Sequence, residues 1–365
     1  MKKSIFHIIF PIFFFSINSC SKENSSNPES FDQENLVFQQ EPETPLKEKT
    51  DSFFVGVAVS TNRLSNGSDY DKIITSEFES VTAEYQMKMN VILPNKNNYN
   101  WTKADQIVNY AIDNNLNIHG HALIWHNSTP DWLKNFQGTN EEFEQEVKDY
   151  ITNVVSRYKG KIKSWDVVNE GVSDSGGELR NTVFLERMGE DYMAKCFEYA
   201  RMADPDVLLF YNDYGMTRNI SKQNKVYDLI QDWKNRNIPI DGIGYQMHIS
   251  YLRPFKSEIE SATNRAVENN LILHFSELDI RMNPDKSLTE LNLERANSQK
   301  EKYKEVVQVY NSIPIQNKYA ITLWGLKDND SWLLQHHDNY YEWPLLFDEN
   351  FKIKKAHTGF LEGLD

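Results

Sequence analysis

Two glutamates, Glu170 and Glu277, each stand at or near the end of an apolar run typical of a buried strand. Glu170 closes "IKSWDVVNE", and Glu277 lies within "LILHFSELD" much further along the chain. Cleavage of a glycosidic bond needs one carboxylic acid that donates a proton and a second carboxylate that attacks or activates water. Trp and Tyr side chains near such a pair offer flat apolar faces for sugar rings. The two glutamates therefore predict a glycosidase site, provided that the fold brings them together.

Eight short β-type runs alternate with helical segments along the chain. The runs are "FFVGVAVS", "SVTAEY", "LNIHGHALIW", "IKSWDVVNE", "DVLLFYND", "DGIGYQMH", "LILHFSELD" and "YAITLWG". Between them, segments such as "KADQIVNYAIDNN" and "EFEQEVKDYITNVVSRY" carry apolar residues at spacings of three and four, which indicates amphipathic helices. Strands separated by helices pair in parallel, so eight such units predict an α/β fold, a (β/α)8 TIM barrel. No Gly-rich phosphate turn follows the first run, as would be usual in a doubly wound sheet.

In this type of barrel, side chains at the C-terminal ends of the strands form the active site. Polar and aromatic residues stand at those ends in this chain: Glu84 and Lys88, His121 and Trp125, Asn169 and Glu170, Asn212 and Asp213, Gln246 and His248, Glu277 and Asp279, Trp324 and Trp332. The period of two along a strand places Glu277 and Asp279 on the same face. A histidine beside these carboxylates, such as His248, is expected to hold the attacking glutamate in place and keep it ionised.

Asp166 shares the parity of Glu170 and lies deeper on the same strand. Its negative charge is expected to raise the pKa of Glu170 and so to keep this residue protonated as the acid. Replacement of Asp166 by asparagine should then move the basic limb of the pH–rate profile.

Several motifs follow one another in a fixed order along the chain. They are "GHALIWH", "WDVVNE", "NDY", "DGIGYQMH", "SELD" and "WGLKDNDSW", with "PLLFDENFKIKKAH" near the end. This set resembles glycoside hydrolase family 10, the family of endo-1,4-β-xylanases, from about Phe53 onward. The resemblance implies a retaining mechanism with Glu170 as general acid/base and Glu277 as nucleophile, their carboxyl groups about 5 to 5.5 Å apart. It implies cleavage of internal bonds in xylan and xylo-oligosaccharides, without a cofactor.

The resemblance also gives roles to residues around the two glutamates. Asn169 matches a contact to the sugar 2-hydroxyl, and His248 and Asp279 match the pair that positions the nucleophile. The implied substrate contacts are Glu84, Lys88, His121, Trp125 and Gln246 on the glycone side, Asn212 and Tyr214 on the aglycone side, and Trp324 and Trp332 around the cleavage point.

Two positions depart from the family pattern. Tyr85 stands where asparagine is usual, and Ser128 where glutamine is usual. Both are expected to line the glycone subsites and to bear on sugar preference, so a retaining β-1,4-glucanase or mixed-linkage glycanase is the alternative enzyme. A second class of function is a non-catalytic surface lipoprotein that binds xylan. Two close, mutually repelling carboxylates argue against that class, because a binding module gains nothing from them.

The composition excludes several partners. The chain has 365 residues, a formal net charge of −14 and a pI of about 5.2. An acidic surface repels nucleic acids and anionic bilayers, so a neutral substrate is expected. No metal site is expected either, because no cysteine or spaced carboxylate set completes four ligands with His119, His121 and His126. We expect a monomer.

The first fifty residues differ from the remainder of the chain. Two lysines and an apolar run from Ile5 to Ile17, followed by Cys20, resemble a bacterial lipoprotein signal, which predicts a signal peptide over 1–19 and lipid attachment at Cys20. The apolar run is too short for a membrane span, so the lipid would be the only membrane contact. The polar stretch 20–50 is typical of a flexible linker, leaving 51–365 as one catalytic domain. The protein is expected to be exported and anchored to the cell envelope, on its periplasmic or cell-surface side.

Overall fold

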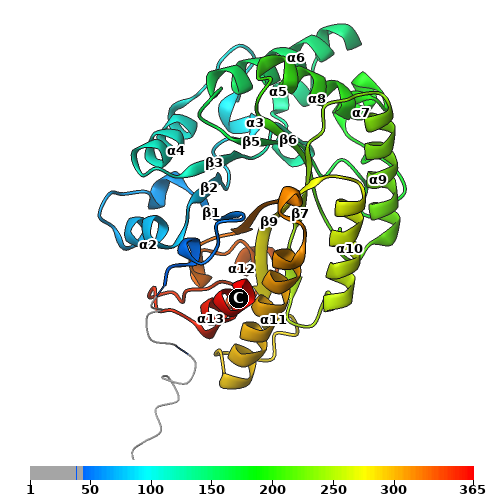
Figure 1. Ribbon diagram of the computed structural model, residues 1–365. Coiled ribbons are helices and arrows are strands. Elements are labelled where there is room, and N and C mark those ends of the chain that lie inside the picture. Colours follow the sequence, from blue (N-terminus) through cyan, green and yellow to red (C-terminus); the bar gives the residue numbers. More distant parts are fainter. Residues whose placement is uncertain (1–37, 39–43) are drawn as a thin grey trace, which may run out of the picture.

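The computed structural model describes Phe38 and residues 44–365 of the chain (Figure 1). The predicted signal peptide, Cys20 and most of the predicted linker lie outside the described residues. Among the described helices, none combines the length and the apolar character that crossing a bilayer requires.

Eight parallel strands form a closed barrel, which confirms the predicted (β/α)8 fold. In barrel order they are β1 (Phe54–Val59), β2 (Ser80–Ala83), β3 (Asn117–Gly120), β5 (Ser164–Asn169), β6 (Leu208–Tyr214), β7 (Gly242–Gln246), β9 (Ile272–Arg281) and β10 (Lys318–Leu323). Strand β10 pairs with both β9 and β1, and this pairing closes the ring. Two short strands, β4 (Ile124–Trp125) and β8 (His248–Ser250), pair with the C-terminal parts of β5 and β9.

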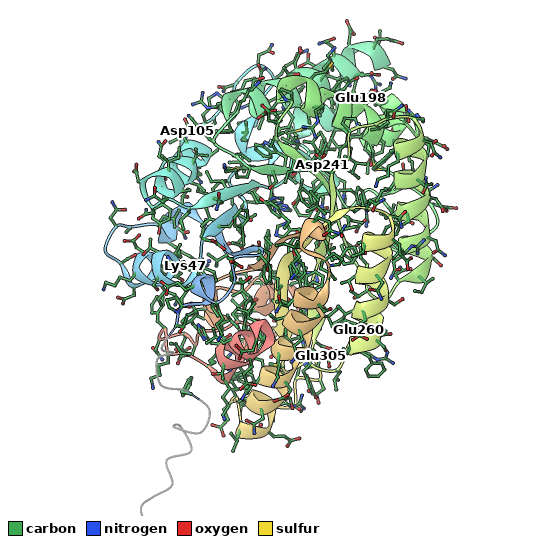
Figure 2. All side chains as sticks on the ribbon, in the orientation of Figure 1. Lys47, Asp105, Glu198, Asp241, Glu260 and Glu305 are labelled. Atoms are coloured by element: carbon green, nitrogen blue, oxygen red, sulfur yellow. The ribbon has the colours of Figure 1, made fainter. Side chains whose placement is uncertain are left out.

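Helices surround the barrel (Figure 1). The α-helices are α2 (Asp69–Glu77), α3 (Met89–Ile92), α4 (Thr102–Asp113), α5 (Asp131–Lys134), α6 (Asn140–Arg157), α7 (Val183–Met188), α8 (Tyr192–Ala203), α9 (Ile220–Asn235), α10 (Lys256–Glu268), α11 (Leu293–Ser312), α12 (Leu333–His336) and α13 (Lys355–Leu364). Short 3-10 turns are η1 (Leu46–Glu48), η2 (Thr61–Arg63), η3 (His126–Ser128), η4 (Ile315–Asn317) and η5 (Asp328–Asp330). The two quoted helical segments correspond to α4 and α6. Exposed charges such as Glu198 and Glu260 lie on this helical layer (Figure 2).

Helix α6 shows how the sequence sets these elements. Its first turn is a capping box, in which the Thr139 hydroxyl accepts a hydrogen bond from the Glu142 N–H and the Glu142 carboxylate accepts one from the Thr139 N–H. Phe143, Val147 and Tyr150 are buried at spacings of three and four, so one face packs inward and fixes the helix on the barrel.

The packed structure begins before the predicted domain boundary at Asp51. Leu46 lies in the predicted linker, yet its side chain is fully buried in the core. Its N–H donates to Glu77 Oε2 at 2.9 Å, and His357 of α13 contacts the same oxygen at 3.1 Å. A single leucine in a polar, Pro-containing stretch has no periodic neighbours, which is why composition alone placed it in the linker.

Cys196 lies in α8 and is fully buried as a free thiol. The interpretation of this residue as a small buried hydrophobe is therefore confirmed.

Candidate active site

A cleft of about 1450 Å³ opens at the C-terminal end of the barrel strands. Both glutamates line it, so residues distant along the chain share one cavity, as the sequence predicts. The other predicted residues on its wall are Glu84, Tyr85, Lys88, His121, Trp125, Asn169, Tyr214, Gln246, His248, Trp324 and Trp332.

The two glutamates are joined by one chain of amide hydrogen bonds. Gln246 Nε2 donates to Glu170 Oε1 at 3.1 Å and to Asn169 Oδ1 at 3.0 Å. Asn212 Nδ2 donates to the same Asn169 oxygen at 2.9 Å and to Glu277 Oε1 at 2.8 Å. Glu170 follows β5 and Glu277 lies on β9, and the two intervening strands, β6 and β7, supply the amides. These bonds fix both carboxyl groups relative to each other.

Glu277 has the environment of an ionised carboxylate. His248 contacts Glu277 Oε2 through Nε2 at 3.1 Å and Asp279 Oδ2 through Nδ1 at 2.8 Å. Burial lowers the pKa of His248, but the two carboxylates outweigh it and raise this pKa to about 10. Burial likewise raises the pKa of Glu277, but the hydrogen bond from His248 and the nearby charges of His121, His248 and Lys88 hold it below its usual value. Glu277 is therefore ionised at neutral pH.

Glu170 has the opposite environment. Burial is the largest cause that raises the pKa of this carboxyl, and the charges of Asp213 and Glu277 raise it further. Hydrogen bonds from Trp125 Nε1, at 2.8 Å, and from Gln246 act in the other direction but do not cancel these effects. Glu170 therefore keeps its proton to a higher pH than an ordinary glutamate, as a general acid must.

Asp166 is not among the main groups that raise the pKa of Glu170. This carboxylate is fully buried inside the barrel, where His119 Nε2 and His121 Nδ1 contact its Oδ2 at 3.0 and 2.8 Å. Burial raises its pKa, but the two histidines outweigh burial and hold it well below its usual range. The histidines come from β3 and from the residue after it, and both contact Asp166 inside the barrel. The nearby aspartate whose charge raises the pKa of Glu170 is Asp213 of β6.

Asp213→Asn is expected to shift the basic limb of the pH profile of kcat/KM to lower pH. The change removes a negative charge that raises the pKa of Glu170. It also leaves Lys222, which pairs with Asp213 at 2.7 Å, with only the more distant Asp174 at 4.0 Å as a partner carboxylate. Both effects lower the pKa of Glu170, so the acid loses its proton, and the enzyme its activity, at a lower pH. The matched control is Asp206→Asn, an exposed carboxylate near the other end of β6, which should leave the limb in place. An unmoved limb in Asp213→Asn would contradict the assignment.

The backbone of Glu170 is held in an uncommon conformation. Its φ is 58°, in the left-handed region that non-glycine residues rarely occupy. Its N–H donates to the Asn212 carbonyl at 2.8 Å, and its carbonyl accepts from Arg180 Nε at 2.9 Å. Arg180 Nη2 also donates to the Tyr214 hydroxyl at 2.9 Å and to Asp174 Oδ1 at 2.7 Å. Arg180 thus ties the backbone of Glu170 to the cleft wall at Tyr214.

Arg180→Ala is expected to lower kcat/KM by about 10²-fold on substrates with poor leaving groups, because a small displacement of a catalytic group has effects of this size. Substrates with good leaving groups need less proton donation and should lose much less. The ratio of the two rates measures the effect. Arg201→Ala is the control, since this arginine is similarly buried but bonds Asp241 at the other end of the barrel. Equal losses on both substrates would indicate a purely structural role.

Two predicted substrate contacts do not lie on the cleft wall. Asn212 is fully buried, and its side-chain amide donates hydrogen bonds to Asn169 and Glu277. Ser128 is also buried, and its hydroxyl donates to the Trp125 carbonyl at 3.3 Å. The 3-10 turn η3 directs Asn127 into the cleft in place of Ser128. Neither residue is therefore placed to touch a sugar.

Tyr85 does line the cleft, at the side predicted for the glycone. Its ring is about half exposed, and its hydroxyl accepts a hydrogen bond from Asn90 at 2.8 Å. Lys88 Nζ lies 5.6 Å from the centroid of this ring and 4.4 Å from that of Trp125. Burial lowers the pKa of Lys88 below its ordinary value, although the negative charges of Glu277, Glu84 and Glu170 act to raise it. Tyr85 thus adds a flat aromatic wall to this side of the cleft.

Some cleft residues carried no signal in the sequence. They stand beyond the barrel strands, in loops, in the short strand β8 or in the short turns and helices that follow, where no period marks an inward face: Asn127, Gly215, Thr217, Arg218, Asn219, Ile220, Ser221, Ile249, Arg253, Pro254, Glu258 and His336. His336 packs against Trp332, with ring centroids 4.6 Å apart. Among the described residues, no group of His, Cys, Asp or Glu side chains forms a candidate metal site.

The chain is similar in sequence to known xylanases. The endo-beta-1,4-xylanase Xyn10C of Cellvibrio japonicus is 36% identical over 339 residues, which cover 86% of this chain and 56% of that protein. Endo-1,4-beta-xylanase B of Thermotoga neapolitana is 34% identical over 330 residues, which cover 89% of this chain and 92% of that protein. The chain spans about half the length of two curated relatives, 56% and 55%, and 31% of another.

A solved structure shows the same fold. Xylanase 10B of Thermotoga petrophila RKU-1, in complex with xylobiose, superposes with a TM-score of 0.83 at 34% identity and covers 89% of this chain and 98% of that one. The model of the family described as "Glycosyl hydrolase family 10" matches residues 46–362. The match covers almost all of the described chain, and the protein belongs to glycosyl hydrolase family 10.

Proposed function

We propose that the protein is an endo-1,4-β-xylanase that hydrolyses internal β-1,4-xylosidic bonds of xylan and retains the anomeric configuration. One observation carries the proposal: a single cleft holds two linked carboxyl groups whose pKa values are moved apart, that of Glu170 upward and that of Glu277 downward. Such a pair supplies an acid and a nucleophile at the same pH.

In the first step, Glu277 attacks the anomeric carbon while Glu170 gives its proton to the departing glycosidic oxygen. The carbon–oxygen bond to the leaving sugar breaks, and a covalent ester between the sugar and Glu277 forms. A direct attack requires the two carboxyl groups to lie about 5 to 5.5 Å apart. The Oδ1 atom of Asn169 accepts from Gln246 and Asn212, which leaves Nδ2 as a donor for the sugar 2-hydroxyl.

In the second step, the ionised Glu170 removes a proton from water, and the resulting hydroxide displaces Glu277 from the anomeric carbon. The ester removes the negative charge of Glu277, which is one cause of the raised pKa of Glu170. Formation of the intermediate therefore favours Glu170 as a base at the moment when a base is needed. The product keeps its original anomeric configuration because two inversions have taken place.

The test is incubation with soluble xylan. New reducing ends, with products that are initially the β-anomer by proton NMR, are the expected result. Binding without release of reducing ends would favour the non-catalytic alternative, and initial α-products would exclude the retaining route.

A retaining β-1,4-glucanase remains the second candidate, and the flat wall at Tyr85 favours it. Comparing kcat/KM on xylo- and cello-oligosaccharides of equal length separates the two. One added or missing substrate group in a pocket changes this ratio by about 10- to 200-fold. A preference for cello-oligosaccharides would replace xylan as the substrate without changing the mechanism.

We also propose a monomer that is exported and lipid-anchored to the cell envelope. The residue pattern from Met1 to Cys20 supports the anchor. Mass spectrometry of the mature N-terminus tests for the lipid on Cys20, and Cys20→Ala should release the protein from the membrane fraction.

A further inference from the structure

A second hollow, of about 600 Å³, lies apart from the catalytic residues. It is lined by residues 289–293, at the start of α11, and by residues 340–343 and 348–349, before α13. Phe38, Asp328, Asn329 and Lys354 complete its lining together with one residue of α12. Helix α12 contributes to both cavities: Leu334 lines the hollow, whereas His336 lines the cleft. We call this cavity the tyrosine hollow, after Tyr340 and Tyr341.

Buried polar side chains fix the two lips of the tyrosine hollow. Asn283, fully buried, donates through Nδ2 to the carbonyls of Leu288 and Tyr341, each at 2.8 Å. The carboxylate of Glu342, also buried, accepts from the Asn283 N–H at 2.9 Å. The backbone that carries the tyrosines is therefore held in place before any ligand arrives, which lowers the entropic cost of binding.

The tyrosine side chains themselves are presented to solvent. Tyr340 is 71% exposed and Tyr341 is 51% exposed, although most large aromatic side chains of the described chain are packed. Neither phenol has a hydrogen-bond partner among the described residues. A tyrosine combines a flat apolar face with a polar tip, and adjacent exposed tyrosines in a hollow form a surface suited to sugar rings.

The charges of the tyrosine hollow select the ligand class. Lys354 is the only cation among its described lining residues, and its Nζ is already engaged by Asp328 and by the carbonyls of Trp343 and Leu345. An anionic ligand therefore finds no free positive group. Glu290 and Glu349 are exposed carboxylates that accept hydrogen bonds from hydroxyl groups. The flat tyrosine rings beside carboxylates that accept hydrogen bonds from hydroxyl groups fit a neutral ligand with many hydroxyl groups. The volume of the hollow is typical of sites for small ligands.

We propose that the tyrosine hollow is a second binding site for the xylan chain, separate from the catalytic cleft. The proposal rests on the proposed function for the identity of the polymer. A weak second site on the same molecule keeps a polymer chain at high local concentration near the cleft. Only polymeric substrates benefit, because a short oligosaccharide occupies one site at a time.

The test is the double variant Tyr340→Ala/Tyr341→Ala in the full chain. In gels that contain soluble xylan, its apparent affinity for the polymer should fall by about tenfold. Its kcat/KM on xylan should fall too, while kcat/KM on xylotriose stays unchanged. The matched control is Met202→Ala/Ile315→Ala, which truncates two side chains that are 63% and 65% exposed elsewhere on the surface.

Each outcome either supports or overturns a second xylan-binding site at the tyrosine hollow. Unchanged retardation of the tyrosine variant overturns the second site, and so does an equal loss of activity on xylotriose, which would mean that the tyrosines act through the cleft. Failure of the proposed function looks different, because the wild-type protein would then release no reducing ends from xylan. Retardation in xylan gels is compared in a Glu277→Gly background, which is not expected to cleave the polymer, so the difference between the proteins with and without the tyrosines reports on the tyrosine hollow in either case.

Discussion

Replacement of Glu277 by glycine is expected to abolish turnover, with kcat lowered by about 10⁵-fold or more, as for the loss of a catalytic nucleophile in other enzymes. The variant removes the carboxylate proposed to form the covalent intermediate, so even aryl xylosides with good leaving groups should not react. Release of the aryl group and of reducing ends from xylan measures the loss. The structural reason is specific: both oxygens of Glu277 are held by neighbours, Oε1 by Asn212 and Oε2 by His248.

Two controls accompany this variant. Circular dichroism and thermal unfolding show whether the barrel survives the loss of a buried side chain. Glu290→Gly, in the exposed loop before α11, removes a carboxylate that is not on the cleft wall and should leave turnover of xylotriose unchanged. Turnover of aryl xylosides by a folded Glu277→Gly protein at more than a small fraction of the wild-type rate would refute the assignment of the nucleophile.

Glu170→Ala is expected to show a dependence on the leaving group. On xylan, which needs proton donation, kcat/KM should fall by about 10²- to 10⁴-fold, the range of general acid–base catalysis. On an aryl xyloside with a dinitrophenolate leaving group, kcat/KM should stay within about tenfold of wild type, because that group departs without a proton. Azide should then restore turnover, since this small anion attacks the intermediate without a base and needs only the space left by the side chain.

The control is Glu178→Ala, an exposed carboxylate in the same loop after β5, which should behave as wild type. The azide product should keep the β-configuration, as displacement of Glu277 requires. If azide rescued Glu277→Gly instead and gave an inverted product, the two roles would have to be exchanged.

The fold could be predicted because parallel barrel strands are buried on both sides and appear as near-continuous apolar runs. That Glu170 and Glu277 share one cleft could be predicted for a related reason. A charged residue that closes such a run, as Glu170 does, must lie where the strand leaves the packed interior. Glu277, His248 and Asp279 followed from the same argument together with the period of two.

Other features depend on contacts between distant segments, which no local pattern reveals. A register irregularity in β5 between Asp166 and Val168 interrupts the period of two on which the expectation for Asp166 depended, and the two histidines that contact Asp166 come from another part of the barrel. Arg180 lies in an irregular loop, and only the structure shows that it holds the carbonyl of Glu170. Ser128 is adjacent to a cleft residue and is nevertheless buried, because a single 3-10 turn decides which side chain faces inward.

The amide chain between the two glutamates has a consequence for engineering. Asn212 donates one hydrogen bond toward each half of the catalytic machinery, and Ser276 in turn donates to its oxygen at 2.7 Å. A substitution at this single buried position would disturb bond breaking and water attack together. A substitution of Asn212 selected for faster formation of the covalent intermediate is therefore expected to change the rate of its hydrolysis as well. The rates of the two steps are expected to change together in evolution.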